Sequence, residues 1–527
     1  MRDPNRWLLP IVTFLLGVAL TIYGGKKFHA HQFSSSPELN KLNEILDYVD
    51  NYYLDTVDRE ALFAGAINGM LQTLDPHSVY SSAEESRQLM ESLGGEFEGI
   101  GVEFTIMNDT VMVVATVADG PSEKVGVRAG DRIVSVDGKT IAGVEITNEM
   151  VFKKLRGKKG TTVRLGIRRP GFKDTYYYNV VRDKIETHTL DVAYMLDDEV
   201  GYIKLSQFGE HTFDEFEAAV EKLKSQGMVS MILDLRGNSG GYMGAAIDIC
   251  NAFLQKRELI VYTEGLRTRS EKVYARGNGC FQEGKLMVLI DDFSASASEI
   301  VAGAVQDNDR GWIVGRRSFG KGLVQQQFSL KDHSTLRLTI ARYHTPSGRC
   351  IQRNYSSGNE EYYEELYNRF VNGEMEHADS IKFDKSLKFK TKKGRIVYGG
   401  GGIMPDYFVP LDRDSNIVAF NEIYNTGLLI EFAFNYANQH KSQLLKQYPS
   451  ATRFVAQMQP SPALVAEFLN FYQSKKKSVR LNATSEKELK IWLKALIGRN
   501  LYRAEGFYPV INRSDKTVLR AYQVIKG

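Results

Sequence analysis

The alternation of apolar strands with helical patterns between residues 199 and 350 constrains the fold of this chain most. Short apolar runs end in polar turns, and amphipathic stretches with three- and four-residue spacing follow them. We predict strands at 200–205, 229–235, 286–290, 312–315 and 336–343, with helices at 212–226, 241–253 and 297–306 between them. Such alternation predicts an α/β layer in which helices cover the faces of a sheet. A further helical insertion is predicted at 355–370.

Length and composition narrow the class of protein. A chain of 527 residues suggests three or four domains. With 67 basic and 64 acidic residues the net charge is +3, and this balance gives no support for nucleic-acid binding. Three cysteines allow at most one disulfide. The histidines are scattered and no His-Glu-x-x-His or Cys-x-x-Cys occurs, so we predict neither a metal site nor a cofactor.

The N-terminus carries an apolar run at 7–23, preceded by two arginines and followed by two lysines. The run exceeds the usual signal-peptide core of about 7–15 residues and is close to the lower limit of about 17 for a membrane span. No clear small-x-small cleavage site follows it. We therefore predict a signal anchor within 1–30, with a cleaved signal peptide as the alternative. Either segment exports residues 30–527, to the periplasmic side of the inner membrane when anchored or into the periplasm when cleaved.

Two further regions have helical character. At 37–93 apolar residues recur at helical spacing, interrupted by Asp75-Pro76-His77-Ser78, and we predict a helical module that is able to pair with a copy of itself in a homodimer. Beyond residue 410 helical patterns return at 417–440, 443–447, 461–475 and 485–498. The segment 510–524 fits a strand or a helix. We find no catalytic constellation in 411–527 and predict a structural or interaction appendage.

Residues 95–183 are rich in short β-runs and glycine turns. The turn Gly99-Ile100-Gly101-Val102 precedes the segment 129–138, Ala-Gly-Asp-Arg-Ile-Val-Ser-Val-Asp-Gly. Together these segments resemble a PDZ domain of the permuted type found in bacterial proteases. The resemblance implies that the backbone N–H groups of Gly99, Ile100, Gly101 and Val102 hold the C-terminal carboxylate of a peptide. The peptide itself would add as a strand to the sheet edge.

Ser296 and Lys321 are the strongest candidates for chemistry. A serine hydroxyl needs a base, and a lysine can serve when burial lowers its pKa. Ser296 follows an apolar strand, and Lys321 lies in a glycine-flanked turn beside apolar residues. Ser296-Ala-Ser-Glu299 also fits a capping box, and the two interpretations are compatible because a helix start offers N–H groups to an oxyanion. The Ala297 amide is the natural first donor, and Gln325 is spaced to hydrogen-bond the lysine.

Four segments, 294–307, 315–325, 338–349 and 401–406, resemble the carboxyl-terminal processing (tail-specific) protease family. The resemblance extends over about 37–410. It implies Ser296 as nucleophile, Lys321 as general base and Gln325 as its positioning partner, acting on protein or peptide substrates. It also implies a crotonase-like α/β protease core at 184–410 with an inserted, mainly-β PDZ domain. The helical module at 37–93 precedes this core, and the helical extension at 411–527 lies outside the common part of the family.

The segment 237–241 offers a rival nucleophile. Gly-Asn-Ser-Gly-Gly matches Gly-x-Ser-x-Gly between a strand and a helix, the context of a nucleophile elbow. On this alternative Ser239 attacks, supported by an aspartate and a histidine; the candidates are Asp292, Asp307, His333 and His344. The family resemblance instead assigns the loop a second oxyanion donor, the Gly240 or Gly241 amide, without deciding between them. A third hypothesis is a non-catalytic scaffold that binds peptides through the PDZ domain alone.

Overall fold

The computed structural model describes residues 36–527 apart from positions 108, 118, 170–171, 383, 412–414 and 477–478. The predicted signal anchor at 1–30 lies outside the described residues. Within the described part of the chain, no helix is both long and apolar enough to cross a membrane. The chain divides into two compact units at Met70, and each is described by itself.

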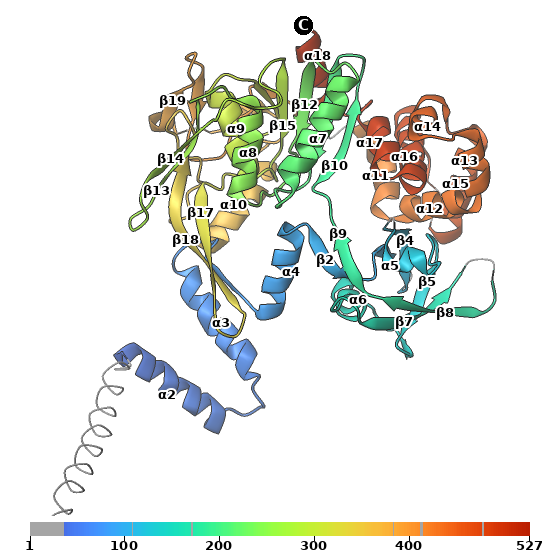
Figure 1. The fold of residues 1–527 in the computed structure, drawn as a ribbon, viewed down its shortest axis with the longest axis horizontal. Coiled ribbons are helices and arrows are strands. Elements are labelled where there is room, and N and C mark those ends of the chain that lie inside the picture. The colour runs from blue at the N-terminus through green and yellow to red at the C-terminus, as the bar shows by residue number, and fades with distance from the viewer. Residues whose placement is uncertain are drawn as a thin grey trace, which may run out of the picture. The chain divides into compact units, whose positions relative to one another are not determined.

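The first unit contains helix α2 (Pro37–Tyr52) and most of α3 (Arg59–Gln72), which confirms helical structure here (Figure 1). The Ser36 hydroxyl accepts a hydrogen bond from the Leu39 N–H and caps α2. No residue of α2 is buried, and its exposed apolar side chains include Leu39, Ile45 and Tyr48. The pattern that predicted this helix therefore marks an apolar face that stays accessible.

The core of the second unit is a six-stranded sheet whose middle strands are parallel. The order is β10 (Leu190–Met195), β11 (Val200–Leu205), β12 (Ser230–Asp234), β15 (Leu286–Ile290), β16 (Trp312–Gly315) and β21 (Tyr407–Phe408). One face carries α7 (Thr212–Ser225), α8 (Met243–Phe253) and α9 (Ala297–Asp307), which lie side by side in Figure 1. These parallel strands are apolar on both faces because helices cover both.

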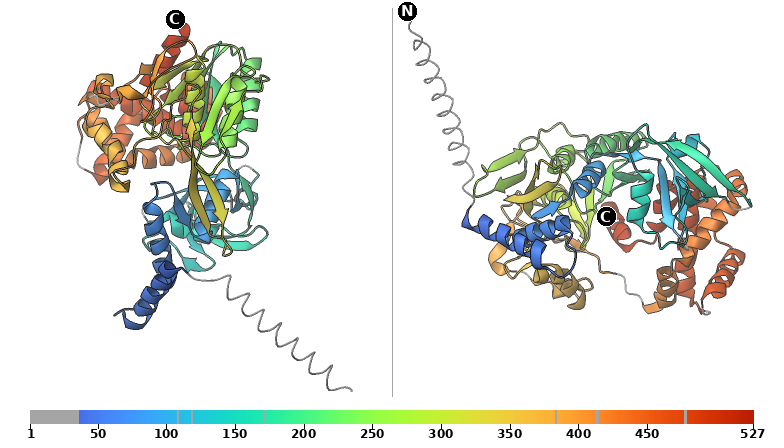
Figure 2. Two further views of the ribbon diagram at one scale, coloured as in Figure 1. Left: turned by 90° about the vertical axis from the view of Figure 1, so that its left-hand side faces the viewer. Right: turned by 90° about the horizontal axis from the view of Figure 1, so that it is seen from below.

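The opposite face of this sheet is covered by the end of the chain. Helix α18 (Lys516–Lys526) packs Val518, Ala521 and Ile525 against strand residues such as Ile232 and Leu289, and α17 (Ala504–Ile511) contacts strand β10 of the same sheet. Figure 2 shows both helix layers from two further sides. The segment for which strand and helix were left open is thus helical over most of its length.

A second sheet joins β1 (Val79–Ser81), β18 (Thr335–His344), β13 (Leu259–Glu264) and β14 (Glu271–Tyr274), with β17 (Leu323–Ser329) paired to β18. The sequence predicted only β18. Strands β1 and β14 are short, and β17 reads Leu-Val-Gln-Gln-Gln-Phe-Ser and is only partly buried, so neither apolar periodicity nor composition marks these three. Strand β13 reads Leu-Ile-Val-Tyr-Thr-Glu, a β-prone run that the prediction missed. The predicted helical insertion forms α10 (Asn359–Val371). Helix α4 (Ala83–Leu93) follows β1, and β19 (Lys388–Lys390) pairs with β20 (Ile396–Tyr398) in a small two-stranded ribbon.

The segment predicted to be a PDZ domain forms its own sheet around a core that includes Val111, Ile133 and Val163. Its strands run in the order β3 (Val102–Ile106), β4 (Val111–Thr116), β5 (Arg132–Val136), β7 (Thr162–Arg168) and β8 (Thr175–Val181), with β6 (Lys139–Thr140) on β5. Two helices accompany them, α5 (Pro121–Lys124) and α6 (Asn148–Leu155). The domain begins and ends in an antiparallel pair, β2 (Glu96–Gly99) with β9 (Asp183–Glu186), which fits an inserted domain.

The C-terminal extension has a core of its own, built on Phe432, Phe454, Phe468 and Leu493. Its helices are α11 (Val418–Asn425), α12 (Leu428–Gln439), α13 (Lys441–Gln447), α14 (Ala451–Gln457), α15 (Pro462–Lys475) and α16 (Ala483–Tyr502). The single helix predicted at 417–440 is wrong in one respect, because it breaks at Gly427. This glycine adopts a φ of 72°, in the left-handed region that a helix interior excludes.

Candidate active site

Ser296 stands at a sharp turn between β15 and α9. It is the residue before the helix and adopts a φ of 55°, a region that few residues other than glycine occupy. Such a conformation persists only where surrounding contacts enforce it, and it is often found at functional sites. The side chain is half-buried, which leaves one side of the hydroxyl open to a ligand.

The buried carboxylate of Glu299 binds the backbone of both candidates. Its Oε2 accepts from the N–H groups of Ser296 at 2.8 Å and Lys321 at 2.9 Å. Its Oε1 accepts from the Gly320 N–H at 2.7 Å and the Ser318 hydroxyl at 2.5 Å. Burial raises the pKa of Glu299, yet four donors around one carboxylate favour the ionised, acceptor-only form. The residue expected to close a helix cap therefore also fixes the Lys321 turn.

The hydroxyl of Tyr343 binds the same two residues through their carbonyl groups. Its single O–H proton is shared between the carbonyl oxygens of Ser296, at 3.1 Å, and Lys321, at 2.8 Å. Tyr343 is fully buried on β18, and burial raises its pKa well above the usual value. One side chain thus holds both N–H groups and another holds both C=O groups, so the two backbone segments have a fixed separation.

The amine of Lys321 is oriented by Gln325. Lys321 Nζ donates to Gln325 Oε1 at 3.1 Å, and Gln325 Nε2 donates to the carbonyl oxygen of His77. Because a carbonyl only accepts, this contact fixes which way the glutamine amide faces and presents its oxygen to the lysine. Burial and then the charge of Arg337 lower the pKa of Lys321 to about 8. Among the described residues, Lys321 Nζ and Ser296 Oγ are not hydrogen-bonded to each other.

The turn Asp75–Ser78 supports this arrangement from a distant part of the sequence. The buried Asp75 carboxylate accepts from the N–H groups of His77 at 2.8 Å and Ser78 at 2.9 Å, and from the hydroxyls of Ser78 at 2.6 Å and Thr339 at 3.0 Å. Burial, then the charge of Lys321, lower the pKa of His77 to about 3, so its ring is neutral. In the sequence, this segment marks only a break in the helical pattern.

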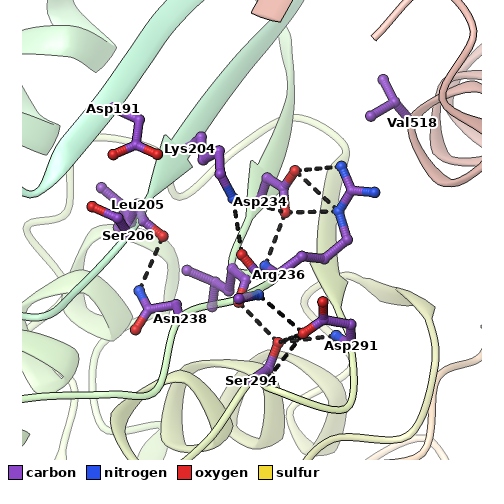
Figure 3. A network of polar contacts seen from close by, with 12 residues as sticks. Asp191, Lys204, Leu205, Ser206, Asp234, Arg236, Asn238, Asp291, Ser294 and Val518 are labelled. Atoms are coloured by element: carbon purple, nitrogen blue, oxygen red, sulfur yellow. Dashed lines mark hydrogen bonds and ion pairs between the residues drawn. The ribbon is translucent and has the colours of Figure 1, made fainter. Parts of the chain in front are cut away.

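The loop after β12 lies beside Asp291 and Ser294, which precede the Ser296 turn (Figure 3). The Asn238 carbonyl accepts from the Ala295 N–H at 3.1 Å and the Ser298 hydroxyl at 2.8 Å, which joins the two segments. The Gly240 N–H donates to Asn238 Oδ1 at 2.9 Å. In the part of the chain that the structure describes, the N–H groups of Ala297 and Gly241 have no hydrogen-bond partner. They are the free donors beside Ser296.

Comparison with known proteins identifies the family. The family model described as "Peptidase family S41" matches residues 199–358, and the model described as "PDZ domain" matches residues 99–180. A carboxy-terminal-processing protease of Bartonella bacilliformis is 41% identical over 320 residues, 60% of this chain and 73% of the relative. The chain belongs to peptidase family S41. This confirms the predicted family, the serine-type peptidase and the fold class: an α/β core, an inserted PDZ domain and helical regions at both ends.

Other matches of this S41 peptidase cover its flanking regions. "Activating protease CtpB N-terminal domain" matches 23–85, and a family of unknown function matches 419–503. The carboxy-terminal processing protease CtpB of Bacillus subtilis is 32% identical over 400 residues, 74% of this chain and 82% of the relative. Among solved structures, a photosystem II D1 C-terminal processing protease is 27% identical at a TM-score of 0.36, covering 71% of this chain and 86% of that one.

The rival serine of this peptidase, Ser239, is exposed on the loop, and no described histidine hydrogen-bonds to it. Its candidate aspartates have other partners: Asp292 pairs with Arg316 at 2.7 Å, and Asp307 pairs with Arg349 at 2.8 Å with both side chains fully buried. His344 stacks on Tyr262, and His333 lies on an exposed turn. The contacts therefore give Ser239 neither an acid nor a base.

The turn at Gly99–Val102 leads directly into β3. Gly101 has a φ of 68°, and Ile100 points into the domain core. The N–H groups of Ile100 and Gly101 have no partner among the described residues. Strand β3, which follows the turn, is an edge strand, and Phe104 on it contacts Phe152 on α6 at a centroid distance of 5.5 Å. An open edge beside a helix is the geometry of a strand-accepting groove.

Across the described residues, no cluster of three or more His, Cys, Asp or Glu side chains has a geometry that could hold a metal ion. The positions that sequence reasoning missed are Tyr343, the Asp75 turn, Asn238 and the role of Glu299 beyond the cap. Only two carried a signal. The Asp-x-x-Ser spacing is typical of an Asx turn, and a glutamate after Ser-x-x is a known backbone acceptor.

Proposed function

We propose that this peptidase cleaves exported proteins with a dyad of Ser296 and Lys321. The observation that carries the proposal is the paired clamp: Glu299 accepts from both N–H groups, and Tyr343 donates to both carbonyl groups. These contacts join two backbone segments that lie 22 to 25 positions apart in the sequence. A fixed separation between nucleophile and base is what such chemistry needs.

In the proposed reaction, neutral Lys321 Nζ accepts the proton of the Ser296 hydroxyl as its oxygen attacks the scissile carbonyl carbon. The carbonyl oxygen becomes an oxyanion bound by the N–H groups of Ala297 and Gly241. We choose Gly241 over Gly240 because the Gly240 N–H already donates to Asn238. Protonated Lys321 then gives the proton to the leaving amine. Water, deprotonated by Lys321, attacks the carbonyl carbon of the acyl-enzyme ester. The bond from that carbon to Ser296 Oγ breaks, protonated Lys321 returns its proton to Oγ, and the new carboxyl group leaves.

Gln325 acts as a positioning residue for Lys321. Its oxygen accepts from the amine in either protonation state, and its own amide is held by the His77 carbonyl. At pH 7, a lysine with a pKa of about 8 is neutral in roughly one molecule in ten. That fraction suffices for a base, whereas an ordinary lysine near 10.4 would be almost wholly charged.

The remaining parts have supporting roles in this proposal. The N–H groups of Gly99–Val102 receive the C-terminal carboxylate of the substrate, which adds along β3. Residues 1–30 anchor the chain in the membrane, with the catalytic unit on the periplasmic side of the cell envelope. Residues 37–93 pair two copies through the exposed apolar face of α2. The domains are 37–93, 95–183, 184–410 and 411–527, and the last contributes α18 to the protease sheet.

Three variants of the full chain test the proposal with an unfolded protein substrate that ends in an apolar tail. Ser296→Ala and Lys321→Ala are expected to abolish cleavage. Ser239→Ala, in the neighbouring loop, is expected to keep it, and its loss of activity would favour the rival nucleophile. Near-normal turnover by Lys321→Ala would contradict the dyad. Binding of the tail without cleavage by the unaltered chain would favour the non-catalytic scaffold.

A further inference from the structure

Arg236 joins the last part of the chain to the loop that carries Gly241, one of the two proposed oxyanion donors. Its Nε and Nη2 contact the carboxylate of Asp234, with the shortest distance 2.6 Å (Figure 3). Its Nη1 contacts both oxygens of Asp515, at 2.8 and 3.1 Å. The guanidinium thus lies between two carboxylates separated by most of the protease sequence, one at the end of β12 and one at the start of α18.

Asp515 is itself held in place. Its Oδ1 accepts from the N–H groups of Thr517 at 2.8 Å and Val518 at 3.0 Å, which caps α18. The helix is anchored on the sheet by buried Val518 and Ala521. At its far end, the Lys285 amine donates to the Ile525 carbonyl at 2.5 Å. A carboxylate fixed in this way can hold the guanidinium in one orientation.

Asp234 and Lys204 also hold Arg236, at its side chain and at its backbone. Although burial opposes it, Arg236 and then Lys204 hold the pKa of Asp234 well below its usual value, so this fully buried group is a carboxylate. Lys204 Nζ also donates to the Arg236 carbonyl at 2.9 Å. Both the side chain and the backbone of Arg236 are therefore fixed immediately before the loop.

Asn238, two residues after Arg236, connects this part of the loop to Leu205 and Gly240. Its Nδ2 donates to the Leu205 carbonyl at 3.0 Å, and its Oδ1 accepts from the Gly240 N–H at 2.9 Å. The second contact leaves the Gly241 N–H free and sets its direction. A movement of Arg236 would therefore tilt the donor that faces the oxyanion, and misplacement by about 1 Å is enough to cost roughly 100-fold in rate.

We propose that Asp515 is a positioning residue for catalysis: through Arg236 it fixes the loop that presents the oxyanion donor. The C-terminal extension thereby contributes to turnover and not only to folding. The inference rests on the proposed function, because it requires an oxyanion formed by attack of Ser296.

The decisive variant is Asp515→Asn in the full chain. Asparagine caps a helix as well as aspartate does, so α18 keeps its start. The new side chain is neutral and turns an amide or a single oxygen toward Arg236, which loses the second carboxylate. We expect kcat to fall about tenfold with KM within twofold, because the peptide-binding groove is untouched.

Ser461→Ala is the matched control. The Ser461 hydroxyl caps α15 by accepting from the Leu464 N–H at 3.2 Å, within the same extension but without contact to the loop. We expect a lower unfolding temperature and an unchanged kcat. If Ser461→Ala lowers kcat as much as Asp515→Asn does, the effect is one of stability and the inference is overturned.

A double-mutant cycle tests the route. If Asp515 acts through Arg236, adding Asp515→Asn to Arg236→Gln should lower kcat no further. A full additional loss would overturn that route. Should Arg236→Gln not fold, the comparison of Asp515→Asn with Ser461→Ala still decides. Ser296→Ala separates failure of the proposed function from failure of the inference about Asp515. If Ser296→Ala keeps turnover, the proposed function fails. If Ser296→Ala is inactive but Asp515→Asn has the wild-type kcat, only the inference is overturned.

Discussion

A methyl group on Gly240 offers the sharpest test of the oxyanion site. A Cβ added there would lie 2.8 Å from the Ser296 Cβ, 2.9 Å from the Ala295 carbonyl oxygen and 3.1 Å from the Ala297 nitrogen. Two of these neighbours are backbone atoms and cannot swing aside. Gly240→Ala should therefore either block the approach to the Ala297 N–H or push the loop away from Ser296.

Either outcome removes at least one oxyanion donor. Loss of one such donor typically costs 100- to 1,000-fold in kcat, about 2.7–4 kcal/mol of transition-state stabilisation. Gly240 also has a φ of 106°, so an alanine there strains the backbone. Gly237→Ala measures the effect of backbone strain without the steric clash. Gly237 lies in the same loop with a φ of 71°, and nothing lies within 4 Å of a Cβ added there. It should cost about 1–2 kcal/mol of stability and change kcat by less than threefold.

Both variants would be assayed as full chains for initial rates on the tailed protein substrate, at saturating concentration, with thermal unfolding followed in parallel. We expect Gly240→Ala to lose at least 100-fold in kcat while remaining folded at the assay temperature. A folded Gly240→Ala with kcat within threefold of the parent would refute an oxyanion site beside Ala297. Equal losses in the two variants would assign the effect to backbone strain.

Three further predictions concern the residues around the amine. The acid limb of kcat/KM should lie near pH 8 and move to higher pH in Arg337→Gln, because removing a positive charge raises the pKa of Lys321; an unmoved limb in a pH–rate profile contradicts this. Gln325→Ala should lower kcat three- to tenfold with KM unchanged in steady-state kinetics, since one hydrogen bond of about 1 kcal/mol is lost; parental kcat contradicts it. Glu299→Gln should lower the free energy of unfolding by about 2–6 kcal/mol in urea titrations, because one carboxylate oxygen becomes an NH2 group and two of the four donors lose their acceptor; an unshifted midpoint contradicts it.

The central strands could be predicted from sequence because burial on both faces makes them apolar throughout. The bounds of β11, β15 and β16 agree with the prediction residue for residue. The proposed nucleophile and base could be named from the sequence because both lie in long segments that resemble the family. Their local surroundings also fit the chemistry, a helix start for Ser296 and a glycine-flanked turn for Lys321.

The contacts that hold the supporting residues could not be predicted, even where a residue such as Gln325 was named from the sequence, because the partners lie far away in the chain. Gln325 and the His77 carbonyl are 248 positions apart, and Arg236 and Asp515 are 279 apart. No periodicity or turn signature records such a pair. The strand β17, which carries Gln325, is also only partly buried, so its pattern resembles that of a loop. Local rules find elements, whereas these contacts depend on how the elements assemble.

The pKa of Lys321 follows from a balance that the fold sets. Burial and the charge of Arg337 lower it, while the carboxylates of Glu299 and Asp75 raise it. A more strongly depressed lysine would be neutral more often but would be a weaker base, so an intermediate value near the working pH serves catalysis best. A buried glutamate costs free energy because its carboxylate loses its hydration, and a helix cap alone would not require that cost. Its place is explained if one charge both holds the two backbone segments and keeps the amine basic.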